Sequence, residues 1–180
     1  VWSIFHKLWH HDSARDCNEI NSVLGTYKII ESKLKWFGKI NVLDIGCGNG
    51  DTLFILKVLG WDAYGLDIDK RAINTAKKRG LNNVRVGSYH ALVKYPDNFF
   101  DAVRLYHVIE HLDNPSLCLK LISKKLKKNG ELVIGTPYVG SIASFMFGNY
   151  WFNLDTPRHI YLFSPHTLKN LLIQQEFHPT

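Results

Sequence analysis

The sequence predicts a doubly wound α/β domain with a mainly parallel sheet. Short apolar runs alternate with helical patterns from Ile40 to Pro137, which is typical of consecutive βαβ units. The runs are apolar on both faces, as expected for strands covered by helices on each side. A chain of 180 residues, 46% of them hydrophobic and 21% charged, can bury one core.

Five segments fit the pattern of a buried strand, because each is short, apolar and bounded by turn-forming residues. They are residues 40–45, 63–67, 84–86, 101–105 and 131–136. Two helices lie between the first three strands. Residues 51–59 are apolar nearly all round and should be buried, and the next helix begins at its N-cap Asp69 and ends at Gly80.

A third helix begins at Asn114 with Pro115 in its first turn, and we expect it to end at Asn129-Gly130. The densest group of basic residues closes this helix: Lys124, Lys125, Lys127 and Lys128. There they would meet solvent and complement the helix dipole, so the net charge of +6 does not by itself predict a nucleic-acid partner.

We expect a single domain over residues 1–180, in four parts. These are a helical N-terminal cover (1–38), the core sheet (39–137), an aromatic lid segment (138–165) and a final helix (166–180). Ser164-Pro165 is expected to open that final helix. No run approaches the ~18 apolar residues of a membrane span. Three cysteines without zinc-finger spacing predict free thiols and a cytoplasmic location.

A glycine-rich turn follows the first expected strand. Gly46, Gly48 and Gly50 are spaced G-x-G-x-G, not G-x-G-x-x-G as in dinucleotide sites, and Asp44 precedes them. A carboxylate there suits a cationic ligand better than a pyrophosphate, and S-adenosylmethionine carries an ammonium and a sulfonium but no phosphate. The expected contacts in this turn are Asp44, Gly46, Cys47, Gly48 and Asn49.

The second expected strand ends in Asp67-Ile68-Asp69, about 20 residues beyond the glycines, where an acidic side chain can bind both ribose hydroxyls. We assign that role to Asp67 and expect Ile68 to pack on the adenine. Asp69 is better explained as a helix cap. We also expect a cofactor contact from Leu105 at the end of the fourth strand.

These residues resemble the class I S-adenosylmethionine-dependent methyltransferases. Residues 44–50 and 66–68 are similar to the first two motifs of that family. Residues 96–101 with 107–112, and 155–159 with 163–165, resemble the branch that includes ubiquinone-biosynthesis O-methyltransferases. The resemblance extends from Asn41 to about Leu172 and implies a Rossmann-like methyltransferase fold, with S-adenosylhomocysteine as the product.

The chain departs from this family at two places. The acidic residue that often holds adenine after the third strand is absent. We expect Ser88 or a backbone group to take its place, and Ser88 and Tyr89 to contact the cofactor. The family fold also ends in an antiparallel hairpin, for which no sequence follows Pro179. We therefore expect either a sheet truncated at that C-terminal hairpin or a chain that is part of a longer protein.

His107 follows the fourth expected strand and is the candidate catalytic base, because histidine has an ordinary pKa near 6.5 and sheets of this class bind ligands at that edge. Alternatively, it starts a helix or packs on the cofactor. His107, Glu110 and His111 could share a helix face and bind a divalent metal, or Glu110 and His111 could anchor the lid. We expect no metal.

The acceptor site is expected to include residues from the lid segment. Arg158 and His159 could bind an acidic group or supply a second base, or form a structural ion pair with Asp155 or Glu110. The aromatic stretch around Trp151 could exclude water or surround the substrate. The residues assigned to substrate are His111, Trp151, Arg158 and His159.

The sequence therefore predicts methyl transfer to a small molecule, at oxygen in preference to nitrogen or carbon. Two alternatives stay open: a methyltransferase directed at RNA or protein, and a cofactor-binding module without turnover. The substrate, the methylated atom and the oligomeric state are not determined by these patterns.

Overall fold

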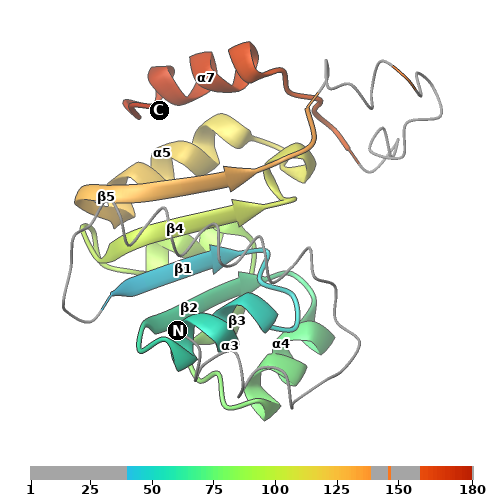
Figure 1. The fold of residues 1–180 in the computed structure, drawn as a ribbon, viewed down its shortest axis with the longest axis vertical. Coiled ribbons are helices and arrows are strands. Elements are labelled where there is room, and N and C mark those ends of the chain that lie inside the picture. The colour runs from blue at the N-terminus through green and yellow to red at the C-terminus, as the bar shows by residue number, and fades with distance from the viewer. Residues whose placement is uncertain (1–39, 139–145, 147–158, 180) are drawn as a thin grey trace.

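The computed structural model describes residues 40–138, 146 and 159–179. Five parallel strands form one sheet in the order β3-β2-β1-β4-β5 (Figure 1). The strands are β1 (Asn41–Ile45), β2 (Asp62–Asp67), β3 (Val84–Val86), β4 (Phe100–Tyr106) and β5 (Leu126–Gly135). The strand order reverses between β1 and β4, so the predicted doubly wound sheet is confirmed.

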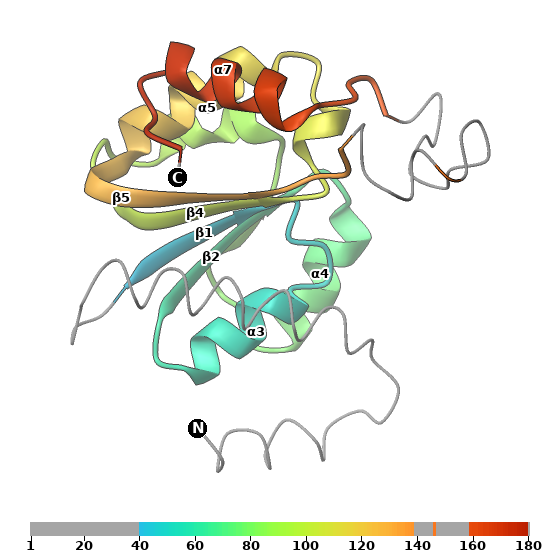
Figure 2. The same cartoon turned by 45° about the horizontal axis from the view of Figure 1, so that its top comes forward.

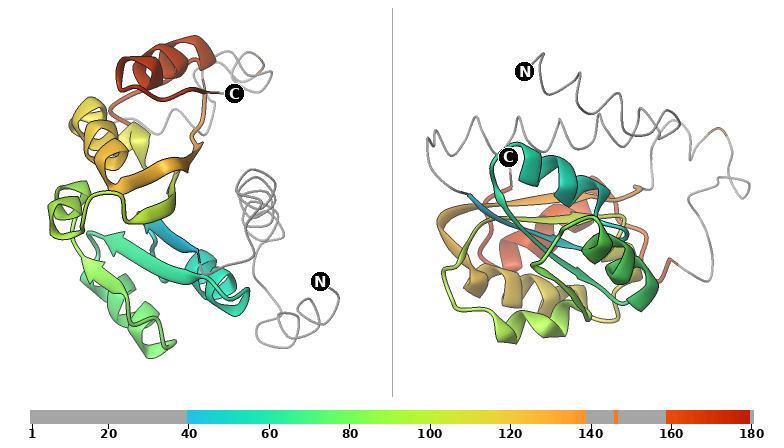
Figure 3. Two further views of the ribbon diagram at one scale, coloured as in Figure 1. Left: turned by 90° about the vertical axis from the view of Figure 1, so that its left-hand side faces the viewer. Right: turned by 90° about the horizontal axis from the view of Figure 1, so that it is seen from below.

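Helices cover both faces of the sheet (Figure 2). The helices α3 (Asp51–Val58) and α4 (Lys70–Lys78) lie on one face, and α5 (Pro115–Lys125) and α7 (Pro165–Gln174) on the other. A view from below shows α3 and α5 on opposite sides (Figure 3). Adjacent residues of β1 therefore enter different cores, with Val42 facing α3 and α4, and Leu43 facing α5.

The expected helix starts are confirmed. The side chain of Asp69 accepts a hydrogen bond from the Arg71 N–H, and that of Asn114 accepts one from the Leu117 N–H. Ser164 forms a capping box at the start of α7. The helix α3 is less buried than predicted, because Leu53 and Leu56 face the core while Val58 is exposed. Two short 3-10 helices, Tyr89–Lys94 and Ile109–His111, follow β3 and β4.

The end of α5 was predicted wrongly. The helix stops at Lys125, and β5 begins at once with Leu126. Leu126 pairs with Phe100 and Glu131 with Ala102, so residues 127–130 bulge out of the ladder between the two pairs. The helix ends earlier than predicted because Leu126 pairs with Phe100 of β4, and it can do so only in an extended conformation.

The basic residues at this junction are not simply a solvated helix end. Lys125 is 10% exposed and pairs with Asp97, and Lys127 binds both carboxylate oxygens of Asp101 at 2.8 Å. Two of the four lysines thus connect α5 and β5 to the start of β4. This use of their charge supports the view that the cluster is structural.

Several expectations fall on residues that the structure does not describe, including the N-terminal cover and most of the lid segment. Among the described residues, Cys47 and Cys118 are free thiols. No helix in the described ranges is long and apolar enough to cross a membrane.

Candidate functional site

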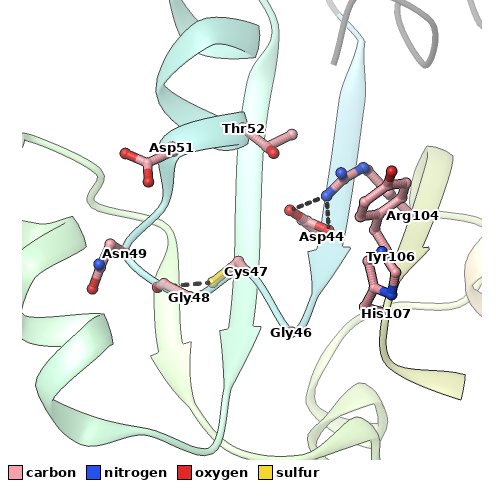
Figure 4. A pocket seen from close by; sticks show the side chains of 10 residues that line it. All are labelled: Asp44, Gly46, Cys47, Gly48, Asn49, Asp51, Thr52, Arg104, Tyr106 and His107. Carbon is pink, nitrogen blue, oxygen red and sulfur yellow. Dashed lines mark hydrogen bonds and ion pairs between the residues drawn. The ribbon is translucent and has the colours of Figure 1, made fainter. Parts of the chain in front are cut away.

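A cleft of about 440 Å³ opens at the carboxyl ends of β1 and β4, where the strand order reverses (Figure 4). Doubly wound sheets bind ligands at this position, because the connections on the two sides diverge there. The cleft is lined by Asp44, Gly46, Cys47, Gly48, Asn49, Asp51, Thr52, Arg104, Tyr106 and His107. It therefore brings together the glycine turn and the candidate base.

The glycine turn has two positions with different constraints. Gly46 has a φ of 77°, and a Cβ there would lie 2.3 Å from Cγ2 of Val108, so only glycine fits. Gly48 has a φ of 52°, but a Cβ there would meet no atom of the described residues within 4 Å. The bare backbone at Gly48 is thus open to a ligand that approaches the turn.

Asp67 holds this turn against the second strand. Its Oδ2 accepts a hydrogen bond from the Gly48 N–H at 2.7 Å, and its Oδ1 accepts one from the Asp69 N–H at 2.8 Å. The next residue, Ile68, is 78% exposed, which leaves an apolar side chain uncovered at the edge of the sheet. Asp67 and Ile68 lie beside the turn and do not line the cleft itself.

Asp44 is not an isolated carboxylate. Nη1 of Arg104 lies 3.0 and 3.1 Å from its two oxygens, and both side chains are buried. The two residues are register partners on β1 and β4, and the guanidinium also stacks on the Tyr106 ring at 4.5 Å. Sequence reasoning missed Arg104, although a lone arginine in the apolar run of residues 100–105 was a signal for a buried partner.

His107 lies directly after β4 in a left-handed conformation, with a φ of 53°. Its N–H donates to the Gly135 carbonyl at 2.8 Å, which fixes the backbone, and its side chain is 53% exposed. Nδ1 lies 3.3 Å from Oε1 of Glu110. The imidazole is thus held on one side by a carboxylate and lines the cleft.

Glu110 is buried, with 1% of its side chain exposed. Its Oε2 accepts a hydrogen bond from the Thr136 hydroxyl at 2.9 Å, whereas Oε1 lies 3.3 Å from Nδ1 of His107 without an aligned hydrogen bond. Burial alone would raise the pKa of Glu110. The contact with His107, a backbone N–H and the Thr136 hydroxyl outweigh that effect and hold the pKa below its usual value.

Three residues assigned to the cofactor lie away from the cleft. Leu105 is buried in the core on the α5 face. Tyr89 is 2% exposed and donates its hydroxyl to Asp113, and burial together with this bond raises its pKa to about 12. Ser88 is half-buried and accepts a hydrogen bond from the His90 N–H. Of the three, Ser88 is the one whose side chain lies at the surface.

His111 and His159 meet beside Glu110, with ring centroids 4.7 Å apart. The segment carrying His159 is held there because the N–H groups of Ile160 and Tyr161 donate to the Glu110 carbonyl. Potential ligand atoms of Glu110, His111 and His159 lie within 4.8 Å of one another and could hold a metal ion. The metal-binding set considered from the sequence was His107, Glu110 and His111, so the structure brings His159 to this group in place of His107. The other two residues assigned to substrate, Trp151 and Arg158, lie outside the described ranges.

The chain resembles known methyltransferases in both sequence and structure. A family model described as a methyltransferase domain matches residues 9–179. A SAM-dependent methyltransferase from Archaeoglobus fulgidus is 31% identical and superposes with a TM-score of 0.68 over 87% of this chain and 69% of its own. A SAM-dependent methyltransferase from Methanosarcina mazei, 21% identical, shares the fold with a TM-score of 0.68 over 84% of this chain and 85% of its own.

The ubiquinone biosynthesis O-methyltransferase of Rickettsia akari is 28% identical over 140 residues, which cover 74% of this chain and 56% of that relative. The chain thus spans little more than half the length of that relative.

Proposed function

Since this chain belongs to the methyltransferase domain family, we propose that it transfers the methyl group of S-adenosylmethionine to an oxygen of a small organic acceptor. One observation carries the proposal: the glycine turn and His107 line the same cleft. The name of the Rickettsia akari relative supports an oxygen acceptor, since that protein is an O-methyltransferase.

Residues of the cleft and of the strand end beside it fit this cofactor. The open backbone at Gly48 lets a nucleoside come close to the turn, and the exposed Ile68 offers an apolar surface for the adenine. Asp67 lies between them, where its carboxylate can accept hydrogen bonds from the ribose in addition to those from the backbone. We therefore retain Asp67 and Ile68 as the adenosine end of the site.

The cofactor, when bound, supplies an electrophilic methyl group on a sulfonium, so no protein nucleophile is required. The chain supplies position and a base. The Glu110 carboxylate faces Nδ1 of His107 and so favours the proton on that nitrogen. Nε2 is then the basic atom that takes the proton of an acceptor hydroxyl, and Glu110 stabilises the imidazolium that results.

We place the acceptor beside His107, within reach of His111 and His159. Those two side chains lie next to Glu110, and the predicted lid residues Trp151 and Arg158 directly precede His159 or lie close to it in the sequence. We further propose that residues 1–180 form one methyltransferase domain and that it works in the cytoplasm. Free thiols at Cys47 and Cys118 support that location.

Two measurements on the purified chain test the proposed function. Calorimetry with S-adenosylhomocysteine should show binding, and labelled S-adenosylmethionine should then transfer its methyl group to members of a set of phenols and catechols. Parallel reactions contain bulk RNA or unfolded protein. Label in RNA or protein would show that the acceptor is a macromolecule and not a small molecule. Binding without any methyl transfer would indicate a cofactor-binding module without turnover. An absence of binding would overturn the proposal.

A further inference from the structure

Arg79 reaches from the end of α4 to the glycine turn and to α3. The residue is the C-cap of α4, and its Nη1 donates a hydrogen bond to the Asn49 carbonyl at 3.1 Å. The same nitrogen pairs with the carboxylate of Asp51, the first residue of α3. The guanidinium also lies over the Phe54 ring, 5.2 Å from its centroid. One side chain thus connects the glycine turn, the first turn of α3 and the end of α4.

The position of Arg79 at a helix end does not explain these contacts. Cations near a helix C-terminus complement its dipole, but Lys77 and Lys78 already supply them in the last turn of α4. Both lysines are exposed, whereas the Arg79 side chain is only 29% exposed. Because fixing a long side chain costs conformational entropy, three contacts made by one guanidinium indicate a role at the place where they are made.

The partners of Arg79 belong to the wall of the cleft. Asn49 and Asp51 both line it, at the end opposite His107 (Figure 4). Arg79 is not among the lining residues. It can therefore act on a bound ligand through Asn49 and Asp51, without touching the ligand itself.

The glycine turn is held at two points by the neighbouring strand-helix unit of β2 and α4. Asp67, at the end of β2, accepts a hydrogen bond from the Gly48 N–H. Arg79, at the end of α4, donates one to the Asn49 carbonyl. The two bonds fix the peptide groups on either side of the Gly48-Asn49 peptide. The backbone that faces the cleft thus depends on Arg79 as well as on Asp67.

On the premise of the proposed function, we propose that Arg79 is a positioning residue for cofactor binding. It holds the second half of the glycine turn and the first turn of α3 in the arrangement that accepts the nucleoside. A guanidinium suits this role, because its planar fork of donors reaches two acceptors while its face stacks on a ring. Lysine supplies the charge but not the fork or the stacking face.

The test compares cofactor affinity with the conformation of the turn. Calorimetry measures the binding of S-adenosylhomocysteine by the wild-type chain, Arg79→Met and Arg79→Lys. Amide NMR spectra of the ligand-free, isotope-labelled chains follow Gly48 and Gly50, the residues on either side of Asn49. Lys78→Met is the charge-matched control, an exposed cation at the same helix end. Asp69→Ala removes the cap at the other end of α4 and is the control for a loss of stability, which thermal melts measure.

We expect Arg79→Met to bind S-adenosylhomocysteine about tenfold more weakly and to shift the amide signals of Gly48 and Gly50. In turnover, its KM for S-adenosylmethionine should rise with little change in kcat, because the base is intact. Arg79→Lys should recover part of the affinity. Lys78→Met should leave affinity and signals unchanged, and Asp69→Ala should lower the melting temperature without weakening binding.

Two results would overturn the inference. One is wild-type affinity of Arg79→Met, or of Arg79→Lys if Arg79→Met does not fold. The other is an equal loss of affinity in Asp69→Ala, which would assign Arg79 to the stability of α4 alone. Failure of the proposed function has a different result, because the wild-type chain would then not bind S-adenosylhomocysteine.

Discussion

The carboxylate of Asp67 accepts a hydrogen bond from the backbone N–H of Gly48 at 2.7 Å. This bond ties the end of β2 to the turn that follows β1, across 19 residues of sequence. The same side chain that we assign to the ribose thus also sets the shape of the glycine turn. We therefore expect both nucleoside binding and the conformation of the glycine turn to depend on Asp67.

Asp67→Ala should weaken the binding of S-adenosylhomocysteine by about 2 to 4 kcal/mol, because it removes charge-assisted hydrogen bonds to the ligand and to the turn. Calorimetry measures the change. Asp69→Ala is the control, since Asp69 only caps α4: it should lower stability by about 1 kcal/mol and leave affinity unchanged. An unchanged dissociation constant in Asp67→Ala would remove Asp67 from the site.

Substitution at Gly48 should mainly weaken cofactor binding, whereas substitution at Gly46 should mainly lower stability. Gly48→Ala adds a Cβ that meets no atom in the described part of the chain. We therefore expect a stability loss of about 1 kcal/mol from its left-handed backbone and an affinity for S-adenosylhomocysteine about tenfold lower or weaker still. Gly46→Ala places a Cβ against Val108 and should cost about 2 to 3 kcal/mol of stability. Urea unfolding and calorimetry separate the two. Undiminished binding by Gly48→Ala would show that the ligand does not approach this backbone.

His107→Asn should slow methyl transfer about 100- to 10,000-fold and spare the affinity for S-adenosylhomocysteine, because it removes the base but not the turn. Asparagine is the informative substitute, since it tolerates the left-handed backbone that histidine adopts here. His107→Ala adds backbone strain and serves as the comparison. Equal losses of affinity and turnover in His107→Asn would assign His107 to packing instead.

Asp97→Asn should destabilise the chain at pH 7, and the difference from wild type should vanish in acid. The hydrogen bond and charge of Lys125 hold the pKa of Asp97 below its ordinary value of 3.8. A lowered pKa in the folded state contributes stability above the ordinary pKa, which is lost as the pH falls through the folded one. Thermal melts at pH 7 and at about pH 2.5 measure this. A constant difference at both pH values would show that the pair is not the cause.

Cys47 and Cys118 should resist alkylation in the native chain. Burial, and then the nearby Asp44 and Asp67, raise the pKa of the Cys47 thiol, and burial raises the pKa of Cys118 to about 12. Few thiolates therefore exist at pH 8, and the thiolate is the reactive form. Peptide mapping after iodoacetamide treatment should find both modified only in denaturant. Rapid native modification of Cys47 would show that its thiol is exposed and ionised.

The elements that local chemistry dictates were predictable. Asp69, Asn114 and Ser164 cap the helices at which they were expected, because capping depends on residues within one turn. The glycine turn could also be predicted from the sequence, because its left-handed backbone conformation favours glycine. The end of α5 was not, because it depends on how β5 pairs with β4, and that pairing joins residues distant in sequence.

For this protein, the sequence alone determined the alternation of strands and helices, the glycine turn and its neighbouring aspartates, and the place of His107 after a strand. These follow from periodicity and turn chemistry within short segments. Only the tertiary structure decided that Asp44 is paired with Arg104, that Glu110 faces Nδ1 of His107, and that His159 lies beside His111. Arg104 and His159 are distant in sequence from the residues that they contact, and the contact of His107 with Glu110 depends on the backbone path after β4, so residue spacing alone does not determine any of the three contacts.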